Sequence, residues 1–526
     1  IPHPFKKFSF AAIPDFQFGG MEHPGAIWYN ANILFLDSSA TRTQLIRRAN
    51  LIAHETSHMW FGDLVTMRWF DDVWMKEVFA NFMADKIVGI ILPDDNIDIK
   101  FVVDHFPLSY SIDRTKGANP IRQELENLQE AGTLYGHIIY HKAPIMMLQL
   151  ERLIGEQALQ SGLQEYLKTY SFDNASWPDL ITILDTNTPE DLQSWNDNWV
   201  NKAGRPTYTR MITDPKGDNY GLFDVDTTKI AELYKITDPV LRAFQYINLY
   251  ENMLEGRFID PNTFVTVTLT ALDYEKEELL IQQLLSQLGV AYWNFISADQ
   301  RAARAGELES KLWTLMEQAN KNNLKKMFFK SYTGIAQSDA ATTKIYSLWK
   351  NKTAPSGVNL TDDEYADLAT WLAIRNHPQS REILNEQLTR IDNTDKKQRW
   401  EFWMPALSPD EKERDAFFES LKNANNRRKE SWVNTALSYL HHPLRRESAE
   451  KYIRPSLELL PEIQKTGDIF FPQNWLQAIL TYHNSENAAQ TVQQFIDENP
   501  DFSKRLLNKL LQGADMLFRA NRKSTN

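Results

Sequence analysis

Two histidines flank a glutamate in a pattern that suits metal chemistry. The segment His54-Glu55-Thr56-Ser57-His58 lies in a stretch whose apolar spacing predicts a helix over about residues 41–61. Histidines four positions apart share one helix face, with Cβ atoms about 6 Å apart, so both imidazoles can bind one zinc ion at about 2.0–2.1 Å. Glu55 could then act as general base on a water whose pKa zinc lowers to about 7.

Glu77 is the candidate third ligand. It follows His58 by 19 positions, near the start of a second helix predicted over residues 73–88, for which Asp71 and Asp72 are candidate N-caps. Two histidines and one glutamate leave a fourth coordination position for water or substrate, which a catalytic zinc site needs. A motif of three fixed residues can also arise by chance, and Glu77 is what favours the metal site over that alternative.

The composition limits both the chemistry and the partners. The 526 residues include no cysteine, which excludes disulfides and zinc–thiolate sites, so any metal must bind to histidines and carboxylates. With 57 basic and 69 acidic residues the net charge is −12, which argues against a nucleic-acid partner. No apolar run approaches the roughly 20 residues that span a bilayer. The lack of thiols favours a bacterial periplasmic or exported protein.

The elements that must position these residues fall into three regions. Residues 1–203 combine strand-like runs, at 8–13 and 33–36, with several helices. Residues 204–235 are interrupted by glycines and prolines and predict a linker or reduced β-sandwich with two or three strands. Residues 236–526 are typical of successive helices, with capping boxes starting at Thr361 and Ser408. We therefore expect a mainly α protein with a large, solenoid-like C-terminal domain.

Several segments together resemble the aminopeptidase N family of zinc metallopeptidases. The family motif, His-Glu-x-x-His followed by eighteen residues and a Glu, is met by His54, His58 and Glu77. Three further segments resemble the family in the same order along the chain: Gly19-Gly20-Met21-Glu22-His23, the run at residues 59–67, and Tyr140-His141-Lys142-Ala143. The resemblance implies a thermolysin-like α(+β) catalytic domain over residues 1–203, one Zn²⁺ per chain, and release of N-terminal amino acids from peptides.

The same resemblance implies roles for residues outside the metal motif. Glu22 resembles the family glutamate that pairs with the free α-ammonium group of the substrate, and backbone at Gly20 and Met21 would line the peptide. Tyr140 resembles the family tyrosine that stabilises the oxyanion of the tetrahedral intermediate. An ordinary loop carboxylate is the alternative for Glu22, and Tyr135 is the alternative donor to Tyr140.

The sequence also departs from the family. His23-Pro24 replaces the usual Asn-Trp, and Val78 and Ala143 each stand where the family has glycine, but no ligand or acid–base group is lost. The large N-terminal β-domain of the family has no counterpart ahead of residues 19–23, and residues 206–235 are too few for its β-sandwich. We therefore expect a fragment or a processed chain, which also fits Ile1 as the first residue.

Three other functions are alternatives to that of an aminopeptidase. A thermolysin-like endopeptidase would use the same zinc and base, but the Glu22 carboxylate disfavours a continuing acyl chain. A non-catalytic helical scaffold would be expected to have lost ligands or the base, which are all present. An epoxide hydrolase side activity, found in one branch of the family, has no support in the residues. For hydrogen bonds to the zinc histidines, Asn81 and Asp85 are both candidates, and a solvated or capping side chain is the alternative for each.

Overall fold

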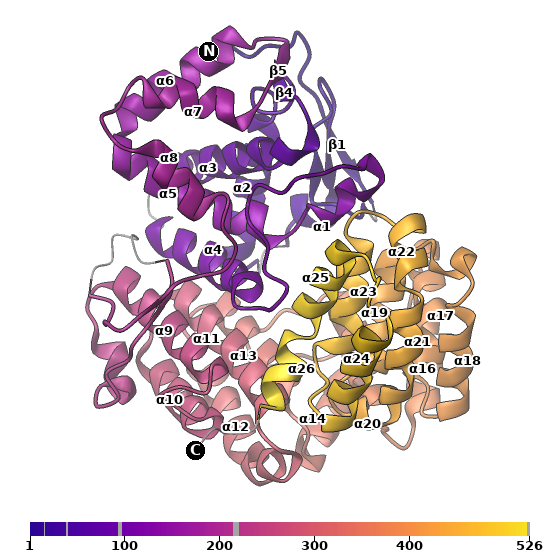
Figure 1. The fold of residues 1–526 in the computed structure, drawn as a ribbon. Helices are drawn as coiled ribbons and strands as arrows, with labels where there is room; N and C mark the ends of the chain where they lie inside the picture. Colours follow the sequence, from indigo (N-terminus) through magenta and orange to yellow (C-terminus); the bar gives the residue numbers. More distant parts are fainter. Residues whose placement is uncertain (15, 38–39, 93–96, 214–219, 523–526) are drawn as a thin grey trace. The chain divides into compact units, whose positions relative to one another are not determined.

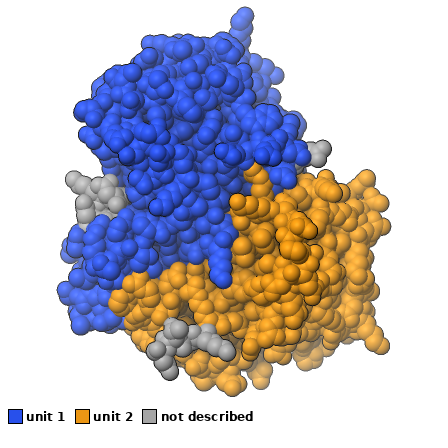
Figure 2. Space-filling model, in the orientation of Figure 1, with its two compact units in different colours: residues 1–251 blue, residues 252–526 orange. Residues whose placement is uncertain are grey.

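The computed structural model describes residues 1–14, 16–37, 40–92, 97–213 and 220–522, and these are predominantly helical (Figure 1). They form two compact units, Ile1–Glu251 and Asn252–Asn526 (Figure 2). The boundary falls inside helix α9 (Pro239–Leu254). The division into two units does not test the predicted domain bounds 1–203, 204–235 and 236–526, which stay a prediction.

Two buried ion pairs join Glu251, near the end of α9, to other parts of the first unit. The two carboxylate oxygens of Glu251 accept hydrogen bonds from Arg114 and Arg205, each at 2.8 Å, and all three side chains are nearly inaccessible to water. Each guanidinium donates to a different oxygen of the carboxylate, and removing one partner would leave an uncompensated buried charge.

The strands of the first unit form small sheets at the edges of its helices. The first sheet has the order β1-β3-β2, with β1 (Phe10–Ile13) parallel and β2 (Gly20–Met21) antiparallel to β3 (Ile27–Asn30). The other two sheets each pair two short parallel strands: β4 (Val65–Met67) with β5 (Asp173–Ala175), and β6 (Thr207–Tyr208) with β7 (Leu222–Phe223). The predicted strand at 33–36 is wrong. The chain turns there into the short helix α1 (Ala31–Leu34), because the Asn30 side chain accepts a hydrogen bond from the Asn32 amide and caps it.

Two helices carry the predicted metal site. Helix α2 (Arg42–Ser57) begins with a capping box in which Thr41 and Gln44 bond each other's backbone. Helix α3 (Trp74–Ile91) packs against it. The predicted caps of α3 are wrong, because Asp71 and Asp72 lie in the 3₁₀ turn η1 (Phe70–Asp72). Their carboxylates instead accept hydrogen bonds from the Leu125 amide and the Arg122 guanidinium.

The remaining helices of the first unit surround this pair. They are α4 (Ile97–Asp113), η2 (Leu128–Thr133), the π-helical turn η3 (Ile138–Lys142), α5 (Ala143–Ile154), α6 (Glu156–Thr169), α7 (Trp177–Asp185), α8 (Leu192–Trp199) and η4 (Ile230–Lys235). Both α3 and α4 contact η3. The irregular turn η3 therefore lies against α3, the helix that carries the predicted ligand Glu77.

The second unit is helical throughout its described residues. Its elements are α10 (Pro261–Tyr274), α11 (Glu278–Val290), η5 (Ala291–Phe295), α12 (Ala298–Gln318), α13 (Asn322–Ile335), α14 (Asp339–Asn351), α15 (Asp362–Ile374), α16 (Ser380–Thr389), α17 (Thr394–Leu407), α18 (Glu411–Ser420), η6 (Ala424–Arg427), α19 (Glu430–Leu440), α20 (Arg446–Ala449), η7 (Glu450–Tyr452), α21 (Ile453–Glu458), α22 (Leu460–Thr466), α23 (Phe471–Leu480), α24 (Glu486–Glu498), α25 (Lys504–Gly513) and α26 (Asp515–Ala520). Consecutive helices pack in pairs, such as α12 with α13 and α15 with α16, while a regular superhelix stays a prediction.

Helix ends in this unit are stabilised in two ways. The capping box at Thr361 and Glu364 starts α15 as predicted. The one predicted at Ser408 is wrong, because Asp410 caps α18 and Ser408 ends α17. At C-terminal ends, arginines donate to carbonyls that have no partner within the helix, as the half-buried Arg375 does to Ala336 O at 2.7 and 2.9 Å.

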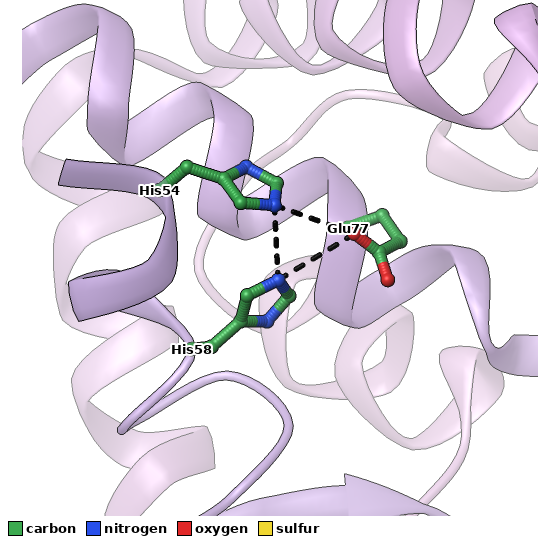
Figure 3. Close-up of side chains that lie close together, drawn as sticks. All are labelled: His54, His58 and Glu77. Atoms are coloured by element: carbon green, nitrogen blue, oxygen red, sulfur yellow. Dashed lines mark hydrogen bonds and ion pairs between the residues drawn. The ribbon is translucent and has the colours of Figure 1, made fainter. Parts of the chain in front are cut away.

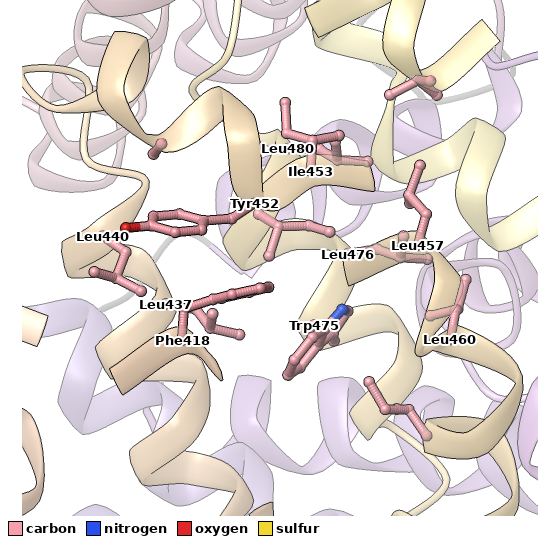
Figure 4. Close-up of a cluster of buried hydrophobic side chains, with 14 of the residues drawn as sticks. Phe418, Leu437, Leu440, Tyr452, Ile453, Leu457, Leu460, Trp475, Leu476 and Leu480 are labelled. Atoms are coloured by element: carbon pink, nitrogen blue, oxygen red, sulfur yellow. The ribbon is translucent and has the colours of Figure 1, made fainter. Parts of the chain in front are cut away.

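One core cluster of the second unit consists of buried apolar side chains from α17 to α26 (Figure 4). Trp475 of α23 lies within it and donates its indole hydrogen to Ser456 O at 3.2 Å. In the first unit the largest buried side chains include Trp74, Trp177 and Phe106. Among the described residues, no helix combines the length and apolar character that crossing a membrane requires.

We predict that Trp475→Ala lowers the free energy of unfolding of the second unit by about 3–5 kcal/mol, because it removes a large buried side chain and leaves a cavity. Urea unfolding followed by far-ultraviolet circular dichroism measures the change. Gln477→Ala, on the exposed face of the same helix, is the matched control and should leave the midpoint nearly unchanged. Equal midpoints for the two variants would contradict this account of the core.

Candidate active site

The residues predicted as metal ligands lie together at the α2–α3 contact (Figure 3). The Nε2 atoms of His54 and His58 are 3.0 Å apart, and each is 3.5 Å from the same Glu77 oxygen, Oε2. In a tetrahedral site with bonds of about 2.0–2.1 Å, ligand atoms lie about 3.3 Å apart. The three separations therefore fit one ion of zinc size, held by a donor set of two nitrogens and one oxygen.

Hydrogen bonds on the far side of each imidazole prepare both histidines for a metal. His58 Nδ1 lies 3.0 Å from Phe61 O, a carbonyl that can only accept, so this nitrogen carries the proton. Asn81 donates its amide to Tyr140 O at 2.9 Å, which turns its own Oδ1 toward His54 Nδ1 at 2.8 Å. Both Nε2 lone pairs consequently face the ligand position, as metal-binding histidines require.

Of the two candidates for this supporting role, only Asn81 contacts a ligand histidine in the described structure. Asp85, one turn further along α3, accepts hydrogen bonds from Asn50, Lys100 and His105 instead. Burial raises the pKa of Asp85, but the charges of Lys100 and His105 outweigh it and hold the pKa well below its usual range. Asp85 therefore belongs to a separate buried ion-pair network that joins α3 to α4.

Glu55 lies beside the metal triad and under strand β2. One oxygen each of Glu22 and Glu55 and one ring nitrogen of His58 all lie within 4.8 Å of one another. A Cβ built on Gly20 would lie only 2.3 Å from Glu55 Oε1 and 2.5 Å from its Cδ, so the absence of a side chain at Gly20 makes room for this carboxylate. Glu55 is 5% exposed, and burial raises its pKa to about 8. A bound divalent cation acts in the opposite direction.

Glu22 joins the same cluster through a lysine. Lys76 Nζ lies 2.6 Å from Glu22 Oε1 and 3.3 Å from Glu77 Oε1, the oxygen of Glu77 that is not shared by the histidines. Burial raises the pKa of Glu22, but the charges of His58 and Lys76 act more strongly together and lower it below its usual value. Glu22 is thus an ionised carboxylate next to the metal triad, with backbone of Gly20 and Met21 leading to it on β2.

Tyr140 lies in the π-helical turn η3. Asn81 of α3 donates a hydrogen bond to the backbone carbonyl of Tyr140. Burial, followed by the negative charges of Glu77 and Glu22, raises the pKa of the Tyr140 phenol well above its ordinary value, so it keeps its proton and can donate it in a hydrogen bond. The Tyr135 ring lies 6.5 Å from that of Tyr140, centroid to centroid, so the alternative donor borders the same region.

The far end of η3 is anchored by a buried ion pair. Lys142 Nζ lies 2.7 Å from Asp113 Oδ2, and both side chains are 1% exposed or less. Asp113 also accepts hydrogen bonds from the Tyr220 hydroxyl at 2.7 Å and the Gly204 amide at 3.2 Å. Residues of the predicted linker therefore help to fix the turn that carries Tyr140.

Sequence reasoning singled out the ligands but missed Lys76 and the Lys142–Asp113 pair. Lys76 directly precedes Glu77, and its partner Glu22 lies 54 positions away in the sequence, too far for local spacing to indicate the pair. Lys142 enters the sequence analysis only through the resemblance of residues 140–143 to the family. A cation in the first turn of a helix, where the macrodipole favours anions, is the signal that could have drawn attention to Lys76.

The site has two histidines and a glutamate on adjacent helices, with a second glutamate beside them. This arrangement is typical of a metallopeptidase. Residues 1–199 match the model of the peptidase family M1 domain. This part of the chain belongs to that family and is aminopeptidase N-like.

Curated relatives agree with this assignment. Probable aminopeptidase 1 of Sulfurisphaera tokodaii is 29% identical over 314 residues, which are 57% of this chain and 40% of the relative. Leucyl aminopeptidase of Saccharolobus solfataricus is 32% identical over 206 residues, 39% of this chain and 26% of the relative. Aminopeptidase N of Lactococcus lactis subsp. cremoris is 33% identical over 215 residues, 40% and 25% respectively. The chain thus spans less than half the length of each of these relatives.

We predict that Gly20→Ala lowers the rate of a Glu55-dependent reaction about 100-fold without unfolding the protein, because the new methyl group displaces the carboxylate by about 1 Å or more. The measurement is kcat/KM together with the thermal midpoint. Gly19→Ala is the control, since a Cβ there meets only the ends of apolar side chains, Leu51 at 3.3 Å and Ile33 at 3.9 Å. If Gly20→Ala stayed within twofold of Gly19→Ala, close contact with Glu55 would have no catalytic consequence.

Proposed function

We propose that this chain is the active-site part of a zinc metallo-aminopeptidase that releases N-terminal amino acids from peptides. The observation that carries the proposal is the position of Glu22. An ionised carboxylate lies within 4.8 Å of both Glu55 and His58, where it can pair with the α-ammonium group of a substrate whose first peptide bond is at the metal. The printed names of the relatives, which are aminopeptidases, support the same activity.

The metal of the proposed enzyme is one Zn²⁺ per chain, held by His54, His58 and Glu77. The two groups of candidate ligands in the described residues share His58, and its Nδ1 is occupied by Phe61 O, so one nitrogen remains for one ion. When bound, zinc supplies Lewis acidity that activates water and polarises the scissile carbonyl.

The protein groups then divide the remaining chemistry among them. Glu55 takes a proton from the attacking water and delivers it to the nitrogen of the leaving peptide, as the C–N bond breaks. Tyr140 donates a hydrogen bond to the oxyanion that forms at the attacked carbonyl. Glu22 holds the α-ammonium group and so sets cleavage after the first residue. Blocked N-termini lack this cation and are not held.

A panel of free and N-acetylated aminoacyl anilides tests the activity directly. We expect the zinc-loaded full-length protein to hydrolyse only the free-amine compounds and to lose that activity on addition of a zinc chelator. Restoring zinc should restore the activity. Cleavage of an N-blocked, internally quenched peptide would instead indicate an endopeptidase, and no cleavage of any free aminoacyl anilide by the zinc-loaded protein would overturn the proposal.

We predict that Glu55→Gln keeps the zinc but lowers kcat about 100- to 10,000-fold, because glutamine retains the shape of the base and cannot accept the proton. Zinc content by elemental analysis and kcat on alanyl anilide are the two measurements. Glu165→Gln, an exposed position on α6, is the matched control. Turnover in Glu55→Gln similar to that of the control would exclude Glu55 as the base.

A further inference from the structure

A protein ammonium group already occupies the carboxylate that is proposed to bind the substrate. Lys76 Nζ lies 2.6 Å from Glu22 Oε1, in a pair whose side chains are only 20% and 16% exposed. Its second partner, at 3.3 Å, is the oxygen of Glu77 that does not face the histidines. The ammonium of Lys76 therefore lies between the amine subsite and the metal subsite, and has carboxylate partners in both.

The structure fixes the direction of the Lys76 side chain. Its aliphatic stem runs along the turn at Gly62, where a Cβ would approach Lys76 Cβ to 3.3 Å and Cδ to 3.4 Å. Gly62 has a φ of +128°, which few other residues adopt, so the backbone conformation favours glycine, and an added Cβ would press on the Lys76 stem. A side chain confined in this way returns its ammonium to the same place.

Helix stability does not explain a lysine at this position. Lys76 lies in the first turn of α3, where the helix macrodipole stabilises anions and disfavours cations. A semi-buried lysine also loses hydration and rotamer freedom. The ion pairs with Glu22 and Glu77 offset these losses of free energy. The charges of the site therefore account for a lysine at this position.

We propose that Lys76 is a specificity-determining residue that competes with the substrate's α-ammonium group for Glu22. The inference rests on the proposed aminopeptidase function. Two ammonium groups on one carboxylate lie within about 5 Å of each other and repel, so the substrate must displace Lys76 or bind beside it at a cost. This cost applies equally to substrate and transition state, because the α-ammonium group takes no part in the bond changes. Lys76 therefore raises KM and leaves kcat nearly unchanged.

The competition has a consequence for which ligands the site accepts. A ligand with an α-ammonium group gains less from Glu22 than an unopposed carboxylate would give it. A ligand of the same shape without the amine meets neither the attraction of Glu22 nor the repulsion of Lys76. Lys76 thus controls the ratio of the two affinities, that of the ligand with the α-amine to that of the ligand without it.

Matched inhibitors measure that preference without relying on turnover of the variant. L-leucine hydroxamate and 4-methylpentanohydroxamate share the zinc-binding group and the side chain and differ only in the α-amine. Their inhibition constants are determined, by competition with leucyl anilide and by calorimetry, for the zinc-loaded full-length protein and for Lys76→Met, which keeps the length of the side chain. We expect Lys76→Met to bind the amine-bearing compound at least about tenfold more tightly, and the compound without the amine equally well.

Two control variants separate charge from structure. Lys76→Arg keeps the cation and should keep the ratio of the two constants within about threefold of the wild type. Lys86→Met makes the same chemical change further along α3, where the lysine pairs with Glu151, and should leave both constants unchanged.

The remaining outcomes overturn the inference in distinguishable ways. An unchanged or smaller preference for the amine in Lys76→Met shows that Lys76 does not compete with the substrate. Equal weakening of both compounds shows that it supports the metal subsite through Glu77. A wild-type protein that binds the two compounds equally and cleaves no aminoacyl anilide overturns the proposed function, and the competition with it.

Discussion

The first unit depends on the convergence of three carboxylates, Glu22, Glu55 and Glu77, onto one small, mostly buried volume. Burial of like charges is unfavourable, and burial, followed by the charges of Glu22 and Glu77, raises the pKa of Glu55. The structure offsets the charge with Lys76 and with two histidines whose Nε2 atoms meet a single Glu77 oxygen. His54, His58 and Glu77 form a group that could hold a divalent cation, and the charge of such an ion would add to this compensation.

A chain of hydrogen bonds leads outward from the metal site and determines how the surrounding elements pack. His54 is oriented by Asn81, and Asn81 by the carbonyl of Tyr140 in η3. Two residues further, Lys142 joins that turn to Asp113 at the end of α4. Because a π-helical turn leaves its backbone locally irregular, contacts at both ends are needed to hold a tyrosine in one place. The position of Tyr140 thus depends on Asn81 of α3 and on the Lys142–Asp113 pair, which follows α3 in the sequence.

The sequence predicted those parts of the site that local spacing determines. His54 and His58 share a helix face because their separation is set by helix geometry, and Glu77 lies on the next helix along the chain. The predominantly helical character was also predictable, from periodicity and from a capping box such as that at Thr361. Roles of individual residues and the domain bounds stay predictions.

The predictions from sequence failed where tertiary contacts determine the partners of a side chain. Asp71 and Asp72 looked like caps but their carboxylates bind Leu125 and Arg122, more than 40 residues away in sequence, and Ser408 ends one helix instead of starting the next. Local propensity has no access to such partners.

Lys76 shows how a conflict between local and tertiary preferences can be informative. Its charge is unfavourable for the first turn of α3, and its stem packs closely on Gly62, a glycine with positive φ. Neither feature favours folding by itself, so each must be offset by interactions elsewhere. Those interactions are with Glu22 and Glu77, the carboxylates nearest the proposed chemistry. A residue that is locally unfavourable, and is stabilised only by groups of the site, is therefore a better indicator of function than one that suits its helix.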